Sequence, residues 1–316
     1  MRIALLDDYQ DVALKMAAWG RLPADCEVIA FRDHLDNEEA LVERLQAFDV
    51  IMAMRERTPL SRQLLQRLPR LKLIVTAGMR NASIDMDAAR EQSVVVCGTA
   101  GLPYPTAELT VGLMLAWARS IAIEDRSLRD GRFQTTLGRG LNGRTLGIIG
   151  LGTLGSRVAK IANAFEMQVL AWSQNLTDER AQAAGVTRVE KDELLKRADY
   201  VTLHVVLSDR TRHLIGAREL ALMKSTACLV NTSRSAIVDE AAMIKALHDR
   251  TIGGVALDVY PIEPLPVDHP IRSAPNTVLT PHLGYVTEET YCTFYGHALE
   301  DIEAYLNGQP VRVLNG

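Results

Sequence analysis

The chain has 316 residues, of which 47 % are apolar and 23 % are charged, and its net charge is −4. A length of this order predicts about two domains with ordinary hydrophobic cores. The near balance of 35 basic and 39 acidic residues argues against nucleic acid as the main partner.

The cysteines and the N-terminus indicate the compartment. Cys26, Cys97, Cys228 and Cys292 are scattered and form no CxxC pair, which is typical of unpaired thiols in a reducing environment. The N-terminal MRIALLDDYQ turns acidic after a brief apolar run, so we expect a first strand there and no signal peptide. No run approaches the ~18 apolar residues of a membrane span. These features predict a cytoplasmic protein.

Short apolar runs alternate with amphipathic segments in the first third of the chain. We expect strands at RIALL, CEVIAF, VIMAM, LKLIVTA and SVVVC, and helices near residues 11–18, 38–47, 61–67 and 85–91. Near-continuous apolar strands separated by helices predict a parallel sheet that is covered on both faces.

The stretch GLPYP at residues 101–105 interrupts this alternation, because proline and glycine end strands. A long helix is expected from about Thr106 to Arg129, and a second alternating series follows GRGLNGR. Its expected strands are TLGIIG, MQVLAW, YVTLHVV, ACLVN, GGVALDV and NTVLT, with helices that start near Thr153, Asp192, Ala217 and Asp239. This order predicts a doubly wound sheet. The C-terminal EETYCTFYGHALEDIEAYLNG is expected to form a helix that packs on the first domain.

A glycine-rich turn follows the first strand of the second series. In GIIGLGTLGSRVAKIA, Gly150, Gly152 and Gly155 have G-x-G-x-x-G spacing between an apolar strand and a helix. The first glycine permits the tight turn, the second lets a pyrophosphate approach the backbone, and the third lets the helix pack on the strand. The helix N-terminus favours an anion. We therefore expect a dinucleotide site, the alternative being a tight turn without a ligand.

Polar side chains follow three further strands, in LVNTSRSAIVDE, GVALDVYPIEP and VLTPHLG. Because the carboxyl ends of the strands share one rim, Arg234, Asp258, Glu263 and His282 can converge there. Arg234 offers a planar fork of donors for a carboxylate, and His282 can give or take a proton near neutrality. Glu263, if hydrogen-bonded to the imidazole, would orient it and favour its charged form. Each residue alone could be a solvated or capping residue. Together, beside a nicotinamide, they would reduce a 2-oxo acid.

These stretches, in this order and over nearly the whole chain, resemble the signatures of the D-isomer-specific 2-hydroxyacid dehydrogenases, which include glyoxylate/hydroxypyruvate reductases and phosphoglycerate dehydrogenases. The resemblance implies an α/β fold with two doubly wound parallel-sheet domains. A Rossmann dinucleotide-binding domain, residues 101–286, would be inserted in a flavodoxin-like substrate domain, residues 1–100 and 287–316. It further implies NAD or NADP as cofactor, no metal, and a homodimer formed through the cofactor domain, to which the helix from Thr106 would be suited.

The resemblance also implies roles for individual residues. Arg234 would bind the substrate, and Glu263 and His282 would be the acid/base pair. The backbone N–H groups of Gly78 and Met79 would bind the substrate carboxylate. Arg55 would close over the substrate, a solvated surface role being the alternative. The residues expected to line the cofactor are Gly150, Gly152, Gly155 and Gly284, Thr153 and Leu154 at the pyrophosphate, Ser173, Gln174 and Asn175 at the ribose, His204, Val205 and Thr232, and Asp258 by the nicotinamide amide.

Three positions depart from the family pattern. Ser235 stands where glycine usually follows the arginine, and Val206 stands where proline is usual. Ser173 stands where an NAD-preferring enzyme usually carries Asp. Without that carboxylate a 2′-phosphate is no longer repelled, and residues 173–175 offer hydrogen-bond donors, with Arg180 as the nearest cation. We therefore expect that NADP is accepted, while NAD use stays open.

Three functions are compatible with these residues. The first is an NAD(P)-dependent reductase of a small 2-oxo acid such as glyoxylate or hydroxypyruvate. The second is a formate or phosphite dehydrogenase of the same fold, which Glu263 disfavours because formate enzymes of this group carry Gln there. The third is a non-enzymatic NAD(P)-sensing protein resembling corepressors. No arginine cluster for a phosphorylated substrate is evident, so small substrates are favoured, but the sequence does not specify which one.

Overall fold

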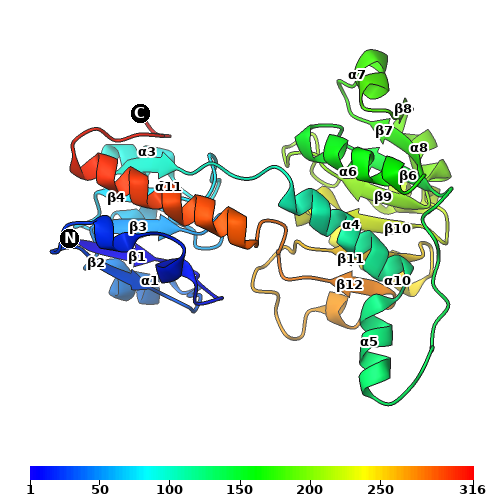
Figure 1. Cartoon of the computed structure of the whole chain (residues 1–316), viewed down its shortest axis with the longest axis horizontal. Helices are drawn as coiled ribbons and strands as arrows, with labels where there is room; N and C mark the ends of the chain where they lie inside the picture. Colours follow the sequence, from blue (N-terminus) through cyan, green and yellow to red (C-terminus); the bar gives the residue numbers. More distant parts are fainter. The chain divides into compact units, whose positions relative to one another are not determined.

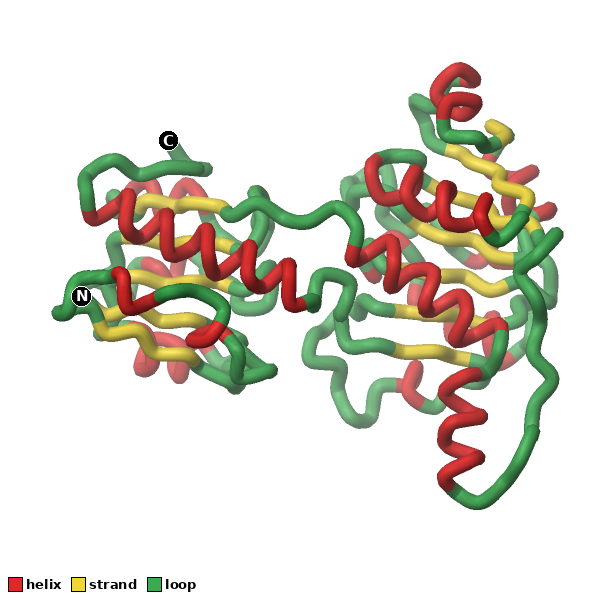
Figure 2. Tube along the Cα trace, viewed as in Figure 1, coloured by secondary structure: helices red, strands yellow, loops and turns green.

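The computed structural model describes all 316 residues, which divide into two compact units. The first unit contains residues 1–102 and 287–316, and the second contains residues 103–286. Each unit has one parallel β-sheet with helices on its faces (Figures 1 and 2). The expected α/β class with two doubly wound parallel sheets is confirmed.

The sheet of the first unit has the strand order β2-β1-β3-β4-β5, with every pair parallel. This is the flavodoxin-like order. The interior strands β3 and β4 bury every side chain, as a sheet covered on both faces requires. The strands are β1 (Arg2–Leu5), β2 (Glu27–Ala30), β3 (Val50–Ala53), β4 (Leu73–Thr76) and β5 (Val95–Gly98), and the α-helices are α1 (Glu38–Leu45), α2 (Arg62–Leu65), α3 (Met86–Glu91) and α11 (Glu288–Leu306).

The helix expected over residues 11–18 is wrong. The segment forms only the short 3-10 helix η1 (Ala13–Lys15), and η2 (Trp19–Arg21) follows it. The carbonyl of Ala13 accepts a hydrogen bond from the indole Nε1 of Trp19 at 2.9 Å. An α-helix would use that carbonyl for the N–H four residues later, so burial of the tryptophan competes with helix extension.

The sheet of the second unit has the order β12-β11-β10-β9-β6-β7-β8, again wholly parallel. Counted from β6, this is the Rossmann order with one added strand. The short edge strand β8 was not expected from the sequence, whereas a helix carrying Arg180 was expected after residues 173–175 and is present as α7. The strands are β6 (Thr145–Ile149), β7 (Gln168–Trp172), β8 (Thr187–Arg188), β9 (Tyr200–Leu203), β10 (Cys228–Asn231), β11 (Gly254–Leu257) and β12 (Thr277–Leu279). The helices that begin after β6 are α6 (Thr153–Ala164), α7 (Asp178–Ala183), α8 (Lys191–Arg197), α9 (Ala217–Leu222) and α10 (Glu240–His248).

The single long helix expected from Thr106 to Arg129 is also wrong. Two helices occupy this stretch, α4 (Pro105–Ala118) and α5 (Ile121–Arg129), and they meet at a bend of 60°. Ser120 lies between them with φ +51°, a left-handed conformation that a right-handed helix cannot contain. No single helix is long and apolar enough to cross a membrane. The bent pair α4 and α5 meets the length and composition criteria only when the two helices are counted together.

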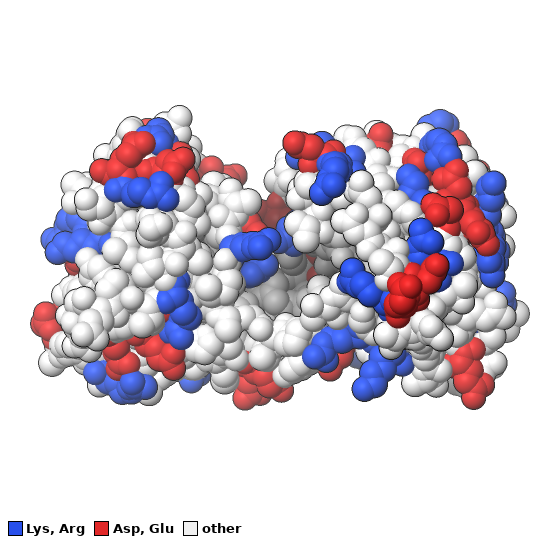
Figure 3. All heavy atoms as spheres, turned by 90° about the horizontal axis from the view of Figure 1, so that it is seen from above, with Lys and Arg blue, Asp and Glu red and all other residues white.

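The surface carries both signs of charge. On the face of each unit drawn in Figure 3, basic and acidic side chains lie near one another instead of gathering by sign. Exposed ion pairs such as Arg67–Glu39 and Arg129–Asp125 account for part of this mixing. Neither unit shows on this face the single-signed field that would attract a polyanion.

The C-terminal segment closes the first unit against α11. Asp301 on α11 is completely buried, and its carboxylate accepts a hydrogen bond from Nε of Arg312 at 2.9 Å. The same segment pairs with β5, where the Gly98 N–H donates to the Arg312 carbonyl at 3.0 Å. Burial raises the pKa of Asp301 to about 7, although the charge of Arg312 opposes the rise.

We predict that Asp301 makes the first unit less stable as the pH rises. Its folded-state pKa lies above the unfolded value of about 3.9, so its contribution to stability is present at low pH and is lost as the pH rises towards about 7. The variant Asp301→Asn does not titrate there. Its free energy of unfolding in urea should therefore fall less than that of the natural chain between about pH 5 and about pH 7. Equal falls in both chains would contradict this assignment.

Candidate active site

The polar residues expected to act together follow the carboxyl ends of neighbouring strands in the second unit. All these strands are parallel, so their carboxyl ends form one rim of the sheet. The residues that follow β6, β9, β10, β11 and β12 are Gly150, His204, Thr232, Asp258 and Thr280.

The turn after β6 is open at the N-terminus of α6. Gly150 has φ +105°, and a Cβ there would lie 2.6 Å from the backbone of the loop after β9. A Cβ on Gly155 would lie 2.1 Å from the Gly150 carbonyl oxygen, so glycine permits the close strand–helix packing. A Cβ on Gly152 would meet nothing within 4 Å, and no side chain caps α6, which begins with Thr153 and Leu154. These residues fit the pyrophosphate of a dinucleotide.

Ser173 connects the end of β7 to the glycine turn. Its hydroxyl oxygen accepts a hydrogen bond from the Leu151 N–H at 2.9 Å. The hydroxyl hydrogen is then left to be donated outward. Gln174 and Asn175 follow in the same turn, and the Asn175 side chain is exposed. The edge of the sheet where the resemblance places the adenosine ribose therefore presents donors and no carboxylate.

His204 is a neutral residue of this rim. Its Nε2 lies 3.0 Å from Oγ1 of Thr202, and its Nδ1 is buried without a hydrogen-bond partner. Burial lowers the pKa of His204 to about 4, so the ring carries no charge near neutrality. Val205 follows it, and its Cγ1 would lie 2.9 Å from a Cβ on Gly150. These residues pack against the glycine turn and hold its shape.

Asp258 ties the end of β11 to the loop that carries His282. Its carboxylate accepts hydrogen bonds from Oγ1 of Thr280 at 2.6 Å and from the N–H groups of Leu283 and Gly284 at 2.7 and 2.8 Å. The residue is completely buried, and burial raises the pKa of this carboxyl group against the opposing effect of the hydrogen bonds. Asp258 thus positions the histidine loop, a function that sequence reasoning missed. Its place directly after a buried strand was the available signal.

The expected contact between Glu263 and His282 is present. Oε2 of Glu263 lies 2.6 Å from Nδ1 of His282, and Oε1 accepts from the Tyr260 N–H at 2.9 Å. Because a carboxylate accepts, Nδ1 carries the hydrogen and Nε2 is left for proton exchange. The two side chains are 24 % and 19 % exposed, so small molecules can reach them. The Tyr285 ring packs edge-on against the imidazole at 5.6 Å.

Arg234 follows β10 on the same rim. Its carbonyl accepts from Nδ2 of Asn231 at 3.0 Å, and its Nη1 donates to the Ser233 carbonyl at 2.8 Å. Ser233 is in turn anchored to the Leu203 carbonyl at 2.7 Å. Ser235 begins the 3-10 helix η3 (Ser235–Ile237), which serine enters without strain, so the departure from glycine leaves the backbone regular.

Thr232 is held inside the unit and does not face solvent freely. It is 7 % exposed, and its Oγ1 lies 2.8 Å from Oγ1 of Thr110 on α4. This contact joins the end of β10 to α4, which packs along the sheet.

Arg55, Gly78 and Met79 lie at the corresponding rim of the first unit. Nη1 of Arg55 donates to the Ala77 carbonyl at 3.2 Å and would lie 2.1 Å from a Cβ on Gly78. Gly78 has φ +96°, a conformation that favours glycine. The Gly78 N–H already donates to Oγ1 of Thr99 at 2.9 Å. The Met79 N–H, beside a side chain that is 47 % exposed, is therefore the better donor for a carboxylate. Thr99, a polar residue directly after the buried strand β5, was not predicted from the sequence as part of this site.

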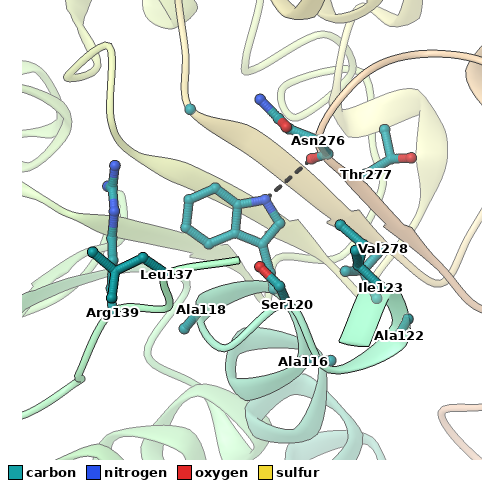
Figure 4. A pocket seen from close by; sticks show the side chains of 12 residues that line it. Ala116, Ala118, Ser120, Ala122, Ile123, Leu137, Arg139, Asn276, Thr277 and Val278 are labelled. Carbon is teal, nitrogen blue, oxygen red and sulfur yellow. Dashed lines mark hydrogen bonds between the residues drawn. The ribbon is translucent and has the colours of Figure 1, made fainter. Parts of the chain in front are cut away.

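A separate hollow of about 200 Å³ lies in the second unit (Figure 4). Asn276 and Thr277 line it at the amino end of β12, away from the rim described above. The Trp117 indole donates to the Asn276 carbonyl at 3.1 Å, and side chains of α5 complete the wall. Ligands of doubly wound sheets bind at the carboxyl ends, so this hollow is not the candidate active site.

Comparisons with known proteins identify the class. The model of the D-isomer specific 2-hydroxyacid dehydrogenase, NAD binding domain, matches residues 111–284. A glyoxylate reductase of Aeropyrum pernix is 40 % identical over 263 residues, which cover 80 % of this chain and 78 % of that protein. The chain belongs to the D-isomer specific 2-hydroxyacid dehydrogenase family, an oxidoreductase family, and the resemblance seen in the sequence is confirmed.

Further relatives carry a different name. A D-3-phosphoglycerate dehydrogenase of Methanocaldococcus jannaschii is 38 % identical over 276 residues, 86 % of this chain but 52 % of that protein. The chain thus spans about half the length of that relative. A crystal structure of a putative D-3-phosphoglycerate dehydrogenase from Ralstonia solanacearum superposes with a TM-score of 0.94 at 37 % identity, over 99 % of this chain and 96 % of that one. The differing names leave the substrate open.

Proposed function

We propose that this chain is an NAD(P)-dependent D-2-hydroxyacid dehydrogenase that reduces a small 2-oxo acid of the glyoxylate or hydroxypyruvate type. The observation that carries the proposal is the 2.6 Å hydrogen bond between Glu263 and His282 on the rim that also holds the glycine turn. A relative named glyoxylate reductase, matched over 78 % of its length, supports a small substrate.

The proposed chemistry divides the work between a bound cofactor and the protein. A reduced nicotinamide, when bound, supplies the hydride that the carbonyl carbon of the substrate accepts. Arg234 binds the substrate carboxylate and polarises the carbonyl oxygen with its fork of donors. Nε2–H of His282 gives its proton to that oxygen, and Glu263 stabilises the imidazolium and fixes the ring. In the first unit, Arg55 and the N–H of Met79 are the proposed ligands of the carboxylate.

The proposed cofactor contacts follow the rim of the second unit. Gly150, Gly152, Gly155, Thr153 and Leu154 would hold the pyrophosphate, and Ser173, Gln174 and Asn175 would face the ribose. The walls of the site would be formed by His204, Val205, Thr232, Asp258 and Gly284, of which Asp258 acts through the loop that it holds.

We predict that the variant His282→Ala loses kcat by at least about 100-fold with glyoxylate or hydroxypyruvate, because a general acid contributes 10²- to 10⁴-fold. Cofactor affinity, measured by fluorescence titration, should be retained. His269→Ala is the matched control, since that histidine also lies near a carboxylate, Glu240 at 3.5 Å, in the same unit. A loss below about tenfold would remove His282 from its assigned role, and absence of turnover in the natural chain would favour a cofactor-sensing protein.

We propose further that NADP is accepted. The support lies in Ser173, whose oxygen is already used by the Leu151 N–H, so that its hydrogen can be donated to a phosphate oxygen. A carboxylate at this position would repel the 2′-phosphate. Arg180 on α7 is the nearest cation in the sequence.

The expected kcat/KM for NADPH is at least equal to that for NADH. The variant Ser173→Asp should shift this ratio towards NADH by about tenfold or more, because it introduces a charge next to the phosphate position. Steady-state assays with both cofactors at one fixed 2-oxo acid concentration measure the ratio. A natural chain with a ratio far below one would contradict the proposal.

A homodimer through the second unit is the proposed assembly. The helix α5 and the segment that follows it expose large apolar side chains, each at least 52 % accessible: Ile121, Ile123, Leu128, Phe133 and Leu137. Ile123 and Leu137 also line the hollow beside Trp117 (Figure 4). Exposed large apolar side chains concentrated on one segment are typical of an interface, and a second copy can cover them by presenting the same segment.

We predict that Ile123→Glu shifts the chain towards the monomer in size-exclusion chromatography with light scattering, because it places a charge inside the apolar contact. Leu14→Glu is the control. Leu14 lies in the first unit and is 50 % exposed, close to the exposure of Ile123 at 53 %. A natural chain that runs as a monomer at micromolar concentration would exclude this assembly.

A further inference from the structure

The loop after β3 holds Arg55 in a conformation that arginine seldom adopts. Arg55 has φ +55°, in the left-handed region, which is unfavourable for any residue with a Cβ. Such a residue persists only where its surroundings hold it. In this conformation the guanidinium of Arg55 lies against Gly78 and donates to the Ala77 carbonyl.

Asn81 supplies the contact that holds this backbone. Its Nδ2 donates to the Arg55 carbonyl at 2.6 Å and lies 2.8 Å from Oγ1 of Thr76 at the end of β4. Its Oδ1 accepts from the Ser83 N–H at 2.9 Å. Because the Arg55 carbonyl needs a donor and the Ser83 N–H needs an acceptor, only one orientation of the Asn81 amide satisfies both. The Asn81 side chain is almost completely buried, at 6 % exposure.

The neighbouring contacts in the same loop act on other atoms. Oγ of Ser83 donates to the Glu56 carbonyl at 3.2 Å, and Oγ1 of Thr58 donates to Oδ2 of the buried Asp7 at 2.7 Å. These bonds fasten the loop downstream of Arg55. The peptide that follows Arg55, whose orientation sets ψ of that residue, is held by Asn81.

We infer that Asn81 is a positioning residue for substrate binding: its side-chain amide keeps Arg55 left-handed, so that the guanidinium lies against the Ala77 carbonyl and Gly78, in the loop that follows β4. This inference rests on the proposed function, since it takes Arg55 as a ligand of the substrate carboxylate. Asn81 itself does not touch the substrate. Its loss should therefore weaken binding of the 2-oxo acid without removing any group that takes part in proton transfer.

The variant Asn81→Asp tests this, because it keeps the size and the Oδ1 acceptor for Ser83 while it removes both Nδ2 donors. We expect KM for the 2-oxo acid to rise about tenfold. The values of kcat and of KM for the nicotinamide cofactor should stay within about twofold. Asn81→Leu, which adds no charge, should give the same pattern, and thermal unfolding verifies that each variant is folded. Ser83→Ala removes the bond to the next carbonyl and should leave KM unchanged.

A double-mutant cycle with Arg55→Ala separates positioning from general damage to the loop. In the Arg55→Ala chain, Asn81→Asp should raise KM by no more than about twofold, because the residue through which Asn81 acts is gone. If the rises in KM of the two single variants multiply in the double variant, or if Asn81→Asp alone leaves KM unchanged, the positioning role is wrong. Reductase activity of the natural chain would still support the proposed function in that case. Absence of 2-oxo acid turnover in the natural chain would overturn this role and the proposed function together.

Discussion

The parallel order of the seven-stranded sheet is the constraint on which the candidate site depends. Strands that all run in one direction release their following loops at one rim, and here those loops carry the glycine turn, Arg234, Glu263 and His282. The strands themselves contribute mainly buried apolar side chains, with Thr202 and Asn231 as polar contacts of the loops. The division of work is that the sheet sets positions and the loops supply donors and acceptors.

Buried polar groups keep these loops from moving independently. The carboxylate of Asp258 accepts three hydrogen bonds from residues 280–284, and Glu263 connects the Tyr260 N–H to the imidazole of His282. Moving one loop would leave a buried polar group without its hydrogen-bond partner, which costs free energy, so these hydrogen bonds hold the loops in place. The candidate acid/base pair is thereby placed by interactions that involve no ligand.

In the first unit, a different set of interactions holds the loops that carry the proposed substrate ligands. There a left-handed arginine, a glycine that leaves space for its guanidinium and a buried asparagine amide form one connected loop system after β3 and β4. The local backbone is unfavourable by itself, and the hydrogen bonds of Asn81 offset that cost. Strained backbone supported by buried side chains is typical of places where a side chain must be held for a ligand.

The two α/β sheets, the glycine turn and the candidate acid/base pair could be predicted from the sequence, because apolar periodicity, glycine spacing and polar residues after strands are local signals. The sequence did not predict the break at Ser120, the shortening of the helix near Ala13, or the roles of Asn81, Thr99 and Asp258. The roles of Asn81, Thr99 and Asp258 depend on partners more than 20 residues away in the sequence: a buried amide, hydroxyl or carboxylate acquires its role only when folding brings a distant N–H or carbonyl within hydrogen-bonding distance and excludes water from both.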